Sequence, residues 1–130
     1  MPINVLLADD SEVVRRGIRK MLEECPDIEV VGEADDLAGT VQMVKDLKPQ
    51  VILIDLHMKG DERIKPENLK SQVDRRSRIV AISFWTDEET RALAESFGAV
   101  AFLDKVRLGD DLVPTIRHLA SASANPTASL

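Results

Sequence analysis

Five short apolar runs, separated by stretches of helical periodicity, restrict most strongly what this chain can fold into. Short runs rich in β-branched residues predict buried strands, and apolar residues that recur every three or four positions predict helices between them. Each gap has room for one crossover helix, which two neighbouring parallel strands require. The runs are INVLLA from Ile3, IEVV from Ile28, VILID from Val51, IVAIS from Ile79 and VAFLD from Val100.

This alternation predicts a doubly wound α/β fold. The expected architecture has three layers, with a five-stranded parallel sheet in the order 2-1-3-4-5 covered by helices on both faces. A short third helix is expected from Pro66 to Asp74, and the last helix is expected to open at Asp110 or Asp111, with Pro114 near its first turn.

The length of 130 residues suits a single domain. We expect this domain at residues 1–120. The small, polar residues 121–130 predict a disordered tail or a truncated interdomain linker.

Charge and cysteine content narrow the partners and the compartment. With 17 Lys+Arg against 23 Asp+Glu the net charge is −6, so the sequence predicts no direct nucleic-acid binding by this chain. The apolar start at Ile3–Ala8 is too short for a signal peptide or a membrane span. The single Cys25 cannot form an internal disulfide. Together these features predict a cytoplasmic protein that does not contact a membrane.

Polar side chains stand where four of the predicted strands end. In the expected strand order, the carboxyl ends of the first and third strands flank the ligand crevice. The first run ends at Asp9 and Asp10, and the third ends at Asp55. Ser83 and Lys105 stand at the ends of the fourth and fifth runs. The topology therefore predicts that these five side chains gather at one edge of the sheet.

Each of these residues also has an ordinary structural explanation. Asp10 or Ser11 could cap the helix that follows. Asp55 could be a turn residue, Lys105 a surface lysine and Ser83 a satisfied core hydroxyl. One cap does not account for two adjacent carboxylates, and it is the combination of these residues that favours a functional site.

Three carboxylates at this edge predict a metal ion. Carboxylates a few ångströms apart repel one another by roughly 1 to 4 kcal/mol per close pair, which one lysine cannot offset. Mg²⁺ binds oxygen ligands and keeps several waters, so it can supply the missing charge. A Mg²⁺ ion beside a carboxylate and a lysine suits phosphoryl transfer. We expect Asp55 to be the nucleophile, with Lys105 and Ser83 contacting the phosphoryl oxygens.

These strand ends resemble those of receiver domains of two-component response regulators. The matching segments are LLADD, VILIDLHM, VAISF and VAFLDK, and the resemblance extends from Ile3 to Leu119. It implies the flavodoxin-like receiver fold and a phosphoaccepting signalling switch, not an enzyme with an external substrate. The segments RRGIRKML, VVGEA and FLDK are most similar to receivers fused to helix-turn-helix regulators of the quorum-sensing-regulator type.

The resemblance implies a role for each matching residue. Asp55 is similar to the phosphoacceptor that receives a phosphoryl group from the phosphohistidine of a sensor histidine kinase or a phosphotransfer protein. Asp10 directly and Asp9 through water resemble the Mg²⁺ ligands, together with Asp55 and the backbone carbonyl of His57. Lys105 is similar to the phosphate-binding lysine.

The resemblance also implies a switch. Ser83 and Phe102 are similar to a pair in which the hydroxyl moves toward the phosphate and the ring turns inward. The face formed by the fourth helix, fifth strand and fifth helix would then repack to bind a partner, and a homodimer is compatible with this arrangement. Phe102 could also be an ordinary core ring of the fifth strand.

The sequence departs from the family pattern near the site. Lys59 replaces the usual proline, which leaves the geometry of the loop after the third strand open. Phe84 stands where a small residue is usual and is followed by Trp85, so bulk here could shield the acyl phosphate or block the kinase. These departures allow an alternative: a receiver-like interaction module that signals without phosphorylation.

A third function stays open as well. An enzyme of similar build could use Asp55 as a turnover nucleophile, as phosphatases do. Such an enzyme would need a second acid two residues later, where His57 stands.

Overall fold

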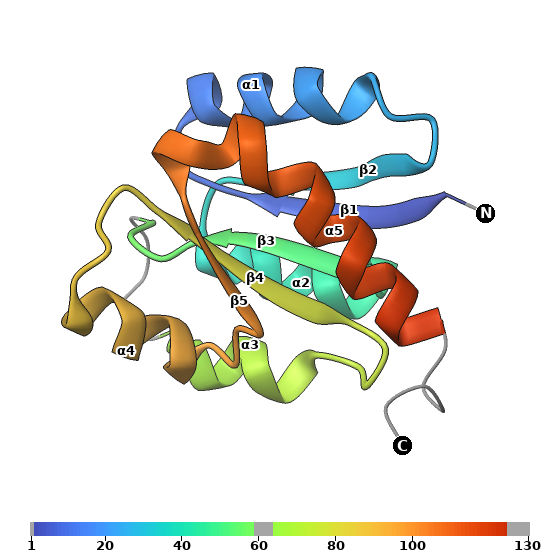
Figure 1. The fold of residues 1–130 in the computed structure, drawn as a ribbon. Coiled ribbons are helices and arrows are strands. Elements are labelled where there is room, and N and C mark those ends of the chain that lie inside the picture. Colours follow the sequence, from blue (N-terminus) through green and yellow to red (C-terminus); the bar gives the residue numbers. More distant parts are fainter. Residues whose placement is uncertain (1, 59–63, 125–130) are drawn as a thin grey trace.

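A computed structural model describes residues 2–58 and 64–124 and confirms the three-layer α/β fold (Figure 1). The five strands form one parallel sheet in the order β2-β1-β3-β4-β5. They are β1 (Ile3–Ala8), β2 (Ile28–Ala34), β3 (Val51–Asp55), β4 (Arg78–Ser83) and β5 (Ala101–Asp104). The helices are α1 (Glu12–Glu23), α2 (Leu37–Leu47), α3 (Pro66–Gln72), α4 (Glu88–Ser96) and α5 (Leu108–Ala124), and a 3-10 turn, η1 (Lys105–Arg107), precedes α5.

Alternate residues of the central strands build two separate cores. In β1, Val5 and Leu7 pack with side chains of α1 and α5. Leu6 and Ala8 point to the opposite face and pack with side chains of α2, α3 and α4. Figure 1 shows α1 and α5 on one side of the sheet and α2 and α3 on the other. Because both faces are covered, the central strands are apolar except near their ends, which explains the nearly continuous apolar runs of the sequence.

The register of the sheet aligns the carboxyl ends of the strands. Ala8 of β1 lies opposite Ile54 of β3, and Ser83 of β4 lies opposite Asp104 of β5. Three residues just beyond these pairs, Asp9, Asp55 and Lys105, therefore lie at the same end of the sheet.

The third helix is confirmed, but the prediction for the start of the last helix is wrong. α5 begins at Leu108, before Asp110, so that Pro114 lies inside the helix. Asp104 accounts for the difference, because its side chain accepts a hydrogen bond from the N–H of Val106 and thereby caps η1. The 3-10 turn continues directly into α5, which needs no cap at position 110. Pro114 then leaves one backbone hydrogen bond of α5 unmade.

Helix α5 also continues to Ala124, so residues 121–124 are helical where the sequence predicts a tail. The alanines of this segment favour helix, which accounts for the extra turn. Residues 125–130 and the loop that contains Lys59 lie outside the described residues, and the domain boundary at 120 stays a prediction.

The two edge strands of the sheet differ. In β2, Val30 pairs with Val5 and Gly32 pairs with Leu6, so Val31 forms a bulge without a partner in β1. At the other edge, β5 contains only four residues.

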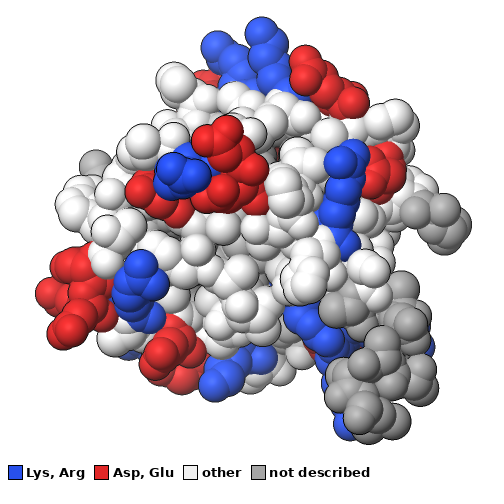
Figure 2. All heavy atoms as spheres, viewed as in Figure 1, with Lys and Arg blue, Asp and Glu red and all other residues white. Residues whose placement is uncertain are grey.

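The surface carries both signs of charge. On the face shown in Figure 2, basic and acidic side chains are intermingled, and the basic ones form no continuous tract. Arg117 of α5 donates two hydrogen bonds of 2.9 Å to the carboxylate of Asp27, which precedes β2. Within the described part of the chain, no helix has both the length and the apolar character that crossing a bilayer requires.

Candidate functional site

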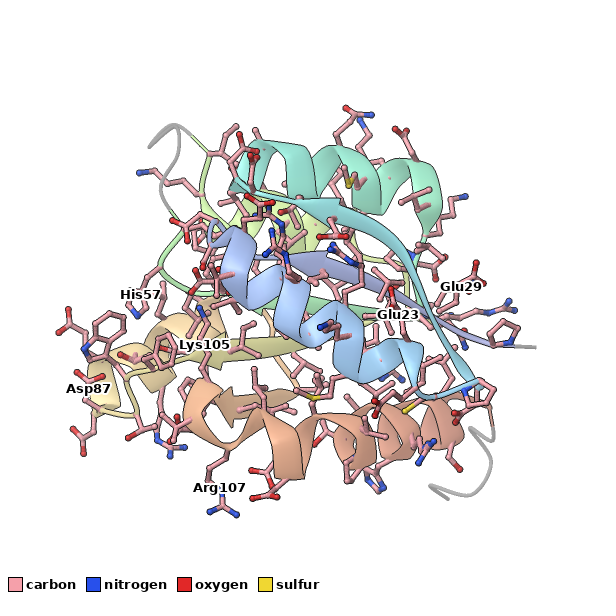
Figure 3. All side chains as sticks on the ribbon, turned by 90° about the horizontal axis from the view of Figure 1, so that it is seen from above. Glu23, Glu29, His57, Asp87, Lys105 and Arg107 are labelled. Carbon is pink, nitrogen blue, oxygen red and sulfur yellow. The ribbon has the colours of Figure 1, made fainter. Side chains whose placement is uncertain are left out.

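The carboxyl edge of the sheet brings the predicted acidic residues together around one lysine. Lys105 Nζ lies 2.7 Å from Asp9 Oδ2 and 3.4 Å from Asp55 Oδ1. Carboxylate oxygens of Asp9, Asp10 and Asp55 all lie within 4.8 Å of one another. Figure 3 shows Lys105 and His57 at this end of the molecule and Glu29 at the opposite end. The structure therefore places three negative side chains beside one positive side chain.

Asp9 is fully buried and is held by the turn that leads into α1. Its Oδ1 accepts a hydrogen bond from the N–H of Ser11 at 2.9 Å, and its backbone oxygen accepts one from Arg15 Nη1 at 2.6 Å. Asp9 Oδ2 has the ion pair with Lys105, but no described group makes a hydrogen bond of good geometry to it. Burial without such a bond is costly, so this oxygen is suited to a further cation.

Ser11, and not Asp10, is the residue that caps helix α1. The Oγ of Ser11 accepts a hydrogen bond from the N–H of Val14 at 3.2 Å and so satisfies one of the free donors of the first turn. Asp10 is exposed and forms the solvent-facing side of the acidic cluster. Neither carboxylate of the pair is therefore required as the helix cap.

Asp55 ends β3 and is 5% exposed. Its Oδ1 accepts a hydrogen bond from the N–H of His57 at 3.1 Å. Burial raises the pKa of Asp55 most, and the negative charge of Asp9 raises it further, against the opposing effects of the His57 N–H and the Lys105 ammonium. A divalent cation among these oxygens would favour the ionised carboxylate instead.

Lys105 is the counter-charge at the centre of the cluster. Its side chain is 6% exposed, which rules out the explanation that it is an ordinary surface lysine. One ammonium faces the carboxylates of Asp9 and Asp55, with Asp10 beside them. If all four groups are ionised, the cluster has an excess of negative charge.

The residues present fit a Mg²⁺ ion. All three candidate ligands of the acidic cluster are carboxylates, which are the hard oxygen donors that Mg²⁺ prefers. Two of them are buried and Asp10 faces solvent, where the ion could keep part of its water shell. The buried Asp9 Oδ2, without a hydrogen bond of good geometry, also fits a cation ligand.

Ser83 and Phe102 lie on the neighbouring strands β4 and β5. Ser83 is fully buried, and its Oγ accepts a hydrogen bond from the N–H of Trp85 at 3.0 Å. This backbone partner agrees with the ordinary explanation of Ser83 as a satisfied hydroxyl, and it leaves the hydroxyl proton for another acceptor. Phe102 is half-buried and packs against the core on the α4 side of the sheet. The guanidinium carbon of Arg91 lies 5.1 Å from the centre of its ring.

The sequence does not predict two ring contacts that the structure places beside the site. The ring of Phe84 has its centre 5.1 Å from Lys105 Nζ. The ring of Trp85 meets that of His57 edge to face, with 4.9 Å between centroids and 75° between planes. The position of Phe84 and Trp85 directly after Ser83 predicts that they lie near the site, but no periodicity indicates which groups their rings contact.

Curated proteins of similar sequence are longer than this chain. The transcriptional regulatory protein LiaR of Bacillus subtilis (strain 168) is 38% identical over 116 residues, which cover 88% of this chain and 54% of LiaR. The chain thus spans about half the length of the curated relatives it matches.

One similar solved structure contains DNA, and it corrects the prediction about nucleic acid. The two-component response regulator RcsB–DNA complex has a TM-score of 0.79 and 25% identity, and the match covers 94% of this chain and 62% of that one. Together with LiaR, which is named a transcriptional regulatory protein, it contradicts the prediction of no direct nucleic-acid binding by this chain. The net charge of −6 describes this chain alone, whereas phosphate contacts depend on basic groups wherever they lie in the whole protein.

The remaining comparisons concern the fold and the family. The response regulator domain of Thermotoga maritima CheB superposes with a TM-score of 0.80 at 26% identity, and the match covers 93% of this chain and 98% of that one. The family model described as the response regulator receiver domain matches residues 5–117, which include every residue of the acidic cluster and Lys105. The chain belongs to the receiver domains of two-component response regulators.

Proposed function

We propose that this chain is a phosphoaccepting switch in which Asp55 takes a phosphoryl group from the phosphohistidine of a sensor histidine kinase or a phosphotransfer protein. The observation that carries the proposal is the convergence of Asp9, Asp10 and Asp55 around the buried Lys105. A purely structural role would leave the repulsion among three carboxylates compensated by one lysine alone. A phosphoryl-transfer site that binds a divalent cation gives each of these charges a function.

Asp9, Asp10 and Asp55 would hold a Mg²⁺ ion, with the backbone carbonyl of His57 as a further ligand. When bound, the ion neutralises charge on the phosphoryl oxygens. The buried Asp9 Oδ2 and the solvent-facing Asp10 support this assignment, because the one lacks a hydrogen bond of good geometry and the other faces the water that Mg²⁺ retains.

Asp55 is the nucleophile in this proposal. Its Oδ1 already accepts the His57 N–H and faces Lys105 Nζ, which leaves Oδ2 as the attacking oxygen. The Oδ2–P bond forms as the P–N bond to the donor imidazole breaks, and the ring nitrogen keeps the electron pair of that bond. Lys105 Nζ, 3.4 Å from the same carboxylate, is close enough to contact a phosphoryl oxygen and stabilise its charge.

Ser83 and Phe102 would carry the change from the site to the surface. Because Ser83 Oγ accepts the Trp85 N–H, its own O–H can donate to a phosphoryl oxygen. Movement of this hydroxyl would displace the turn at Trp85, and Phe102 on the adjacent strand would turn into the vacated space. The face formed by α4, β5 and α5 would then shift between two packing states.

The proposed output is control of a DNA-binding activity. The relative LiaR is named a transcriptional regulatory protein, and the RcsB structure is a complex with DNA. Since the chain spans about half of LiaR, we assign phosphorylation control to this chain and contact with DNA to the whole regulator.

Intact-mass measurement after incubation with Mg²⁺ and phosphoramidate tests the proposal. The wild-type chain is expected to gain one phosphoryl group that is stable to acid and labile to base, and EDTA is expected to prevent the gain. Asp55→Asn is expected to abolish it. Asp46→Asn, an exposed aspartate on α2, is the matched control and is expected to react like the wild type.

Two other outcomes correspond to the alternative functions. A wild-type chain that gains no phosphoryl group from phosphoramidate or from a phosphorylated kinase would indicate an interaction module that signals without phosphorylation. Continuous release of phosphate, far beyond one equivalent per chain, would indicate a turnover enzyme. Either result would contradict the proposed switch.

A further inference from the structure

Two aromatic side chains lie exposed beside the acidic site in a chain that has few aromatic residues. The sequence contains three Phe, one Trp and no Tyr. Phe84 and Trp85 are 54% and 59% exposed, whereas Phe97 in the core is 5% exposed. Half of the Phe and Trp residues of the chain therefore occur at this one place, where they belong to neither core. We call Phe84 and Trp85 the aromatic rim.

The aromatic rim is placed by groups of the site itself. The ring centre of Phe84 lies 5.1 Å from Lys105 Nζ, and this ammonium lies 3.4 Å from Asp55 Oδ1. The ring of Trp85 contacts the ring of His57, whose backbone N–H donates to Asp55. The Trp85 N–H donates to Ser83 Oγ, which fixes the turn that carries both rings. A molecule that delivers a group to Asp55 must therefore pass close to these rings.

Packing within the chain does not explain the aromatic rim. More than half of the surface of each residue remains exposed to water after the contacts to Lys105 and His57 are made. A flat partner that covered these rings would remove their apolar surface from water, and this burial would stabilise the complex.

We propose that Phe84 and Trp85 are specificity-determining residues that bind the imidazole ring of the phosphodonor while its phosphoryl group is transferred to Asp55. The proposal rests on the proposed function and names the part of the donor that this chain recognises. The Asp55 O–P bond forms and the P–N bond breaks. The distal ring nitrogen of the donor carries a proton throughout, so the ring leaves as neutral imidazole with the electron pair of the broken bond.

An imidazole ring suits the aromatic rim on physical grounds. It can stack against Phe or Trp, and in its protonated form it is a cation, which is attracted to aromatic faces. Asp87 adds negative charge nearby: its hydrogen bonds from Thr90 lower the pKa of this carboxyl, and Figure 3 places it at the same end of the molecule as His57. A donor without a ring, such as phosphoramidate, would gain nothing from the aromatic rim.

Comparison of two small donors tests this inference. The rate at which Asp55 gains a phosphoryl group in Mg²⁺ is measured by intact mass with monophosphoimidazole and with phosphoramidate. The quantity compared is the rate with monophosphoimidazole divided by the rate with phosphoramidate. Phe84→Leu keeps apolar bulk but removes the aromatic face, and it is expected to lower this ratio about threefold to tenfold. Trp85→Leu is expected to lower the ratio in the same direction. Phe84→Trp is expected to preserve it.

Val100→Ala is the control. Val100 is an exposed apolar residue just before β5. It lies where the strands begin, whereas the site lies where they end, so this change is expected to leave the ratio unaltered. Because each variant reacts with both donors, a general loss of folding or of Mg²⁺ binding would slow both reactions and leave the ratio intact.

The outcomes separate this inference from the proposed function. Ratios that are equal in wild type, Phe84→Leu and Trp85→Leu, with phosphorylation of Asp55 intact, would overturn the role of the aromatic rim alone. A wild-type chain that neither donor modifies would overturn the proposed function and this inference with it.

Discussion

The polar groups at the two ends of the sheet differ in charge and in pairing. At the end where the strands begin, the amino-terminal edge, the groups are neutral and paired: the half-buried Gln50 accepts the N–H of Asn4 through its Oε1 at 3.0 Å, and the buried Ser77 donates through its Oγ to the carbonyl of Pro49. At the carboxyl edge the groups are charged, and the buried Asp9 Oδ2 has no hydrogen bond of good geometry. The paired neutral groups of the amino-terminal edge stabilise the fold, whereas the buried charges of the carboxyl edge destabilise it and therefore indicate a function.

Lys105→Ala is expected to have the largest effect on the stability of the carboxyl edge. It leaves the buried Asp9 and Asp55 without a counter-charge, so we expect the free energy of unfolding to fall by about 3 kcal/mol in metal-free buffer. Added Mg²⁺ is expected to restore part of this loss, because it supplies positive charge to the same oxygens. Urea unfolding with and without Mg²⁺ measures both effects.

The matched control for this change is Lys45→Ala, an exposed lysine on α2, which is expected to change stability by less than about 0.5 kcal/mol. Equal effects at both positions would mean that Lys105 does not compensate the carboxylates.

Ser77→Ala tests the amino-terminal edge. It removes a buried donor and leaves the carbonyl of Pro49 without a partner, at an expected cost of about 1–3 kcal/mol in the free energy of unfolding. The phosphorylation rate of the folded variant is expected to equal that of the wild type. A slower rate in fully folded protein would show that the two edges are not independent.

The carboxyl edge is also expected to make the stability of the protein depend on pH. Burial raises the pKa of Asp55, so the folded protein binds this proton more tightly than the unfolded chain does. The free energy of unfolding therefore falls as the pH rises from about 3.9, the ordinary pKa of Asp, to the raised pKa of Asp55 in the folded protein. The slope is at most about 1.4 kcal/mol per pH unit.

In metal-free buffer, Asp55→Asn is expected to remove this loss. The difference in unfolding free energy between variant and wild type is then expected to grow with pH across that window and to be constant below it. Mg²⁺ is expected to reduce the difference, because it favours the ionised carboxylate. A difference independent of pH would contradict the raised pKa.

Asp10→Asn is expected to have the smallest effect. Asp10 faces solvent, so the loss of its charge is expected to weaken Mg²⁺ binding by about 1 kcal/mol, or roughly fivefold in Kd. Trp85 is the only Trp of the chain and lies beside the site, so its fluorescence can report a Mg²⁺ titration. Asp74→Asn, near the opposite edge, is expected to leave the titration unchanged. Equal titration curves for wild type and Asp10→Asn would remove Asp10 from the ligand set.

The sequence predicts the fold and the acidic cluster because both follow from periodicity and topology. Apolar runs fix the strands, and parallel strands bring their carboxyl ends to one edge, so Asp9, Asp55 and Lys105 must lie near one another once the strand order is known. Neither step requires knowledge of side-chain conformations.

Loop conformation and the choice between competing caps are not set by periodicity, and there the predictions fail or stop. Asp110 and Asp111 look like helix caps, but Asp104 caps a 3-10 turn that starts the helical segment earlier. The positions of Phe84 and Trp85 depend on the turn after β4, which the hydrogen bond to Ser83 determines. The nucleic-acid prediction is wrong because the net charge of −6 belongs to a chain that spans about half the length of its relatives, and the rest of such a protein can carry basic groups.

The irregular strand β2 and the short strand β5 also affect how the molecule behaves at high concentration. A regular, unpaired strand at the border of a sheet can recruit a strand from another molecule and begin aggregation. The bulge at Val31 interrupts the spacing of backbone donors and acceptors at one border, and the four residues of β5 offer few such groups at the other. Both borders are thereby protected against uncontrolled growth of the sheet, although the central strands are almost entirely apolar.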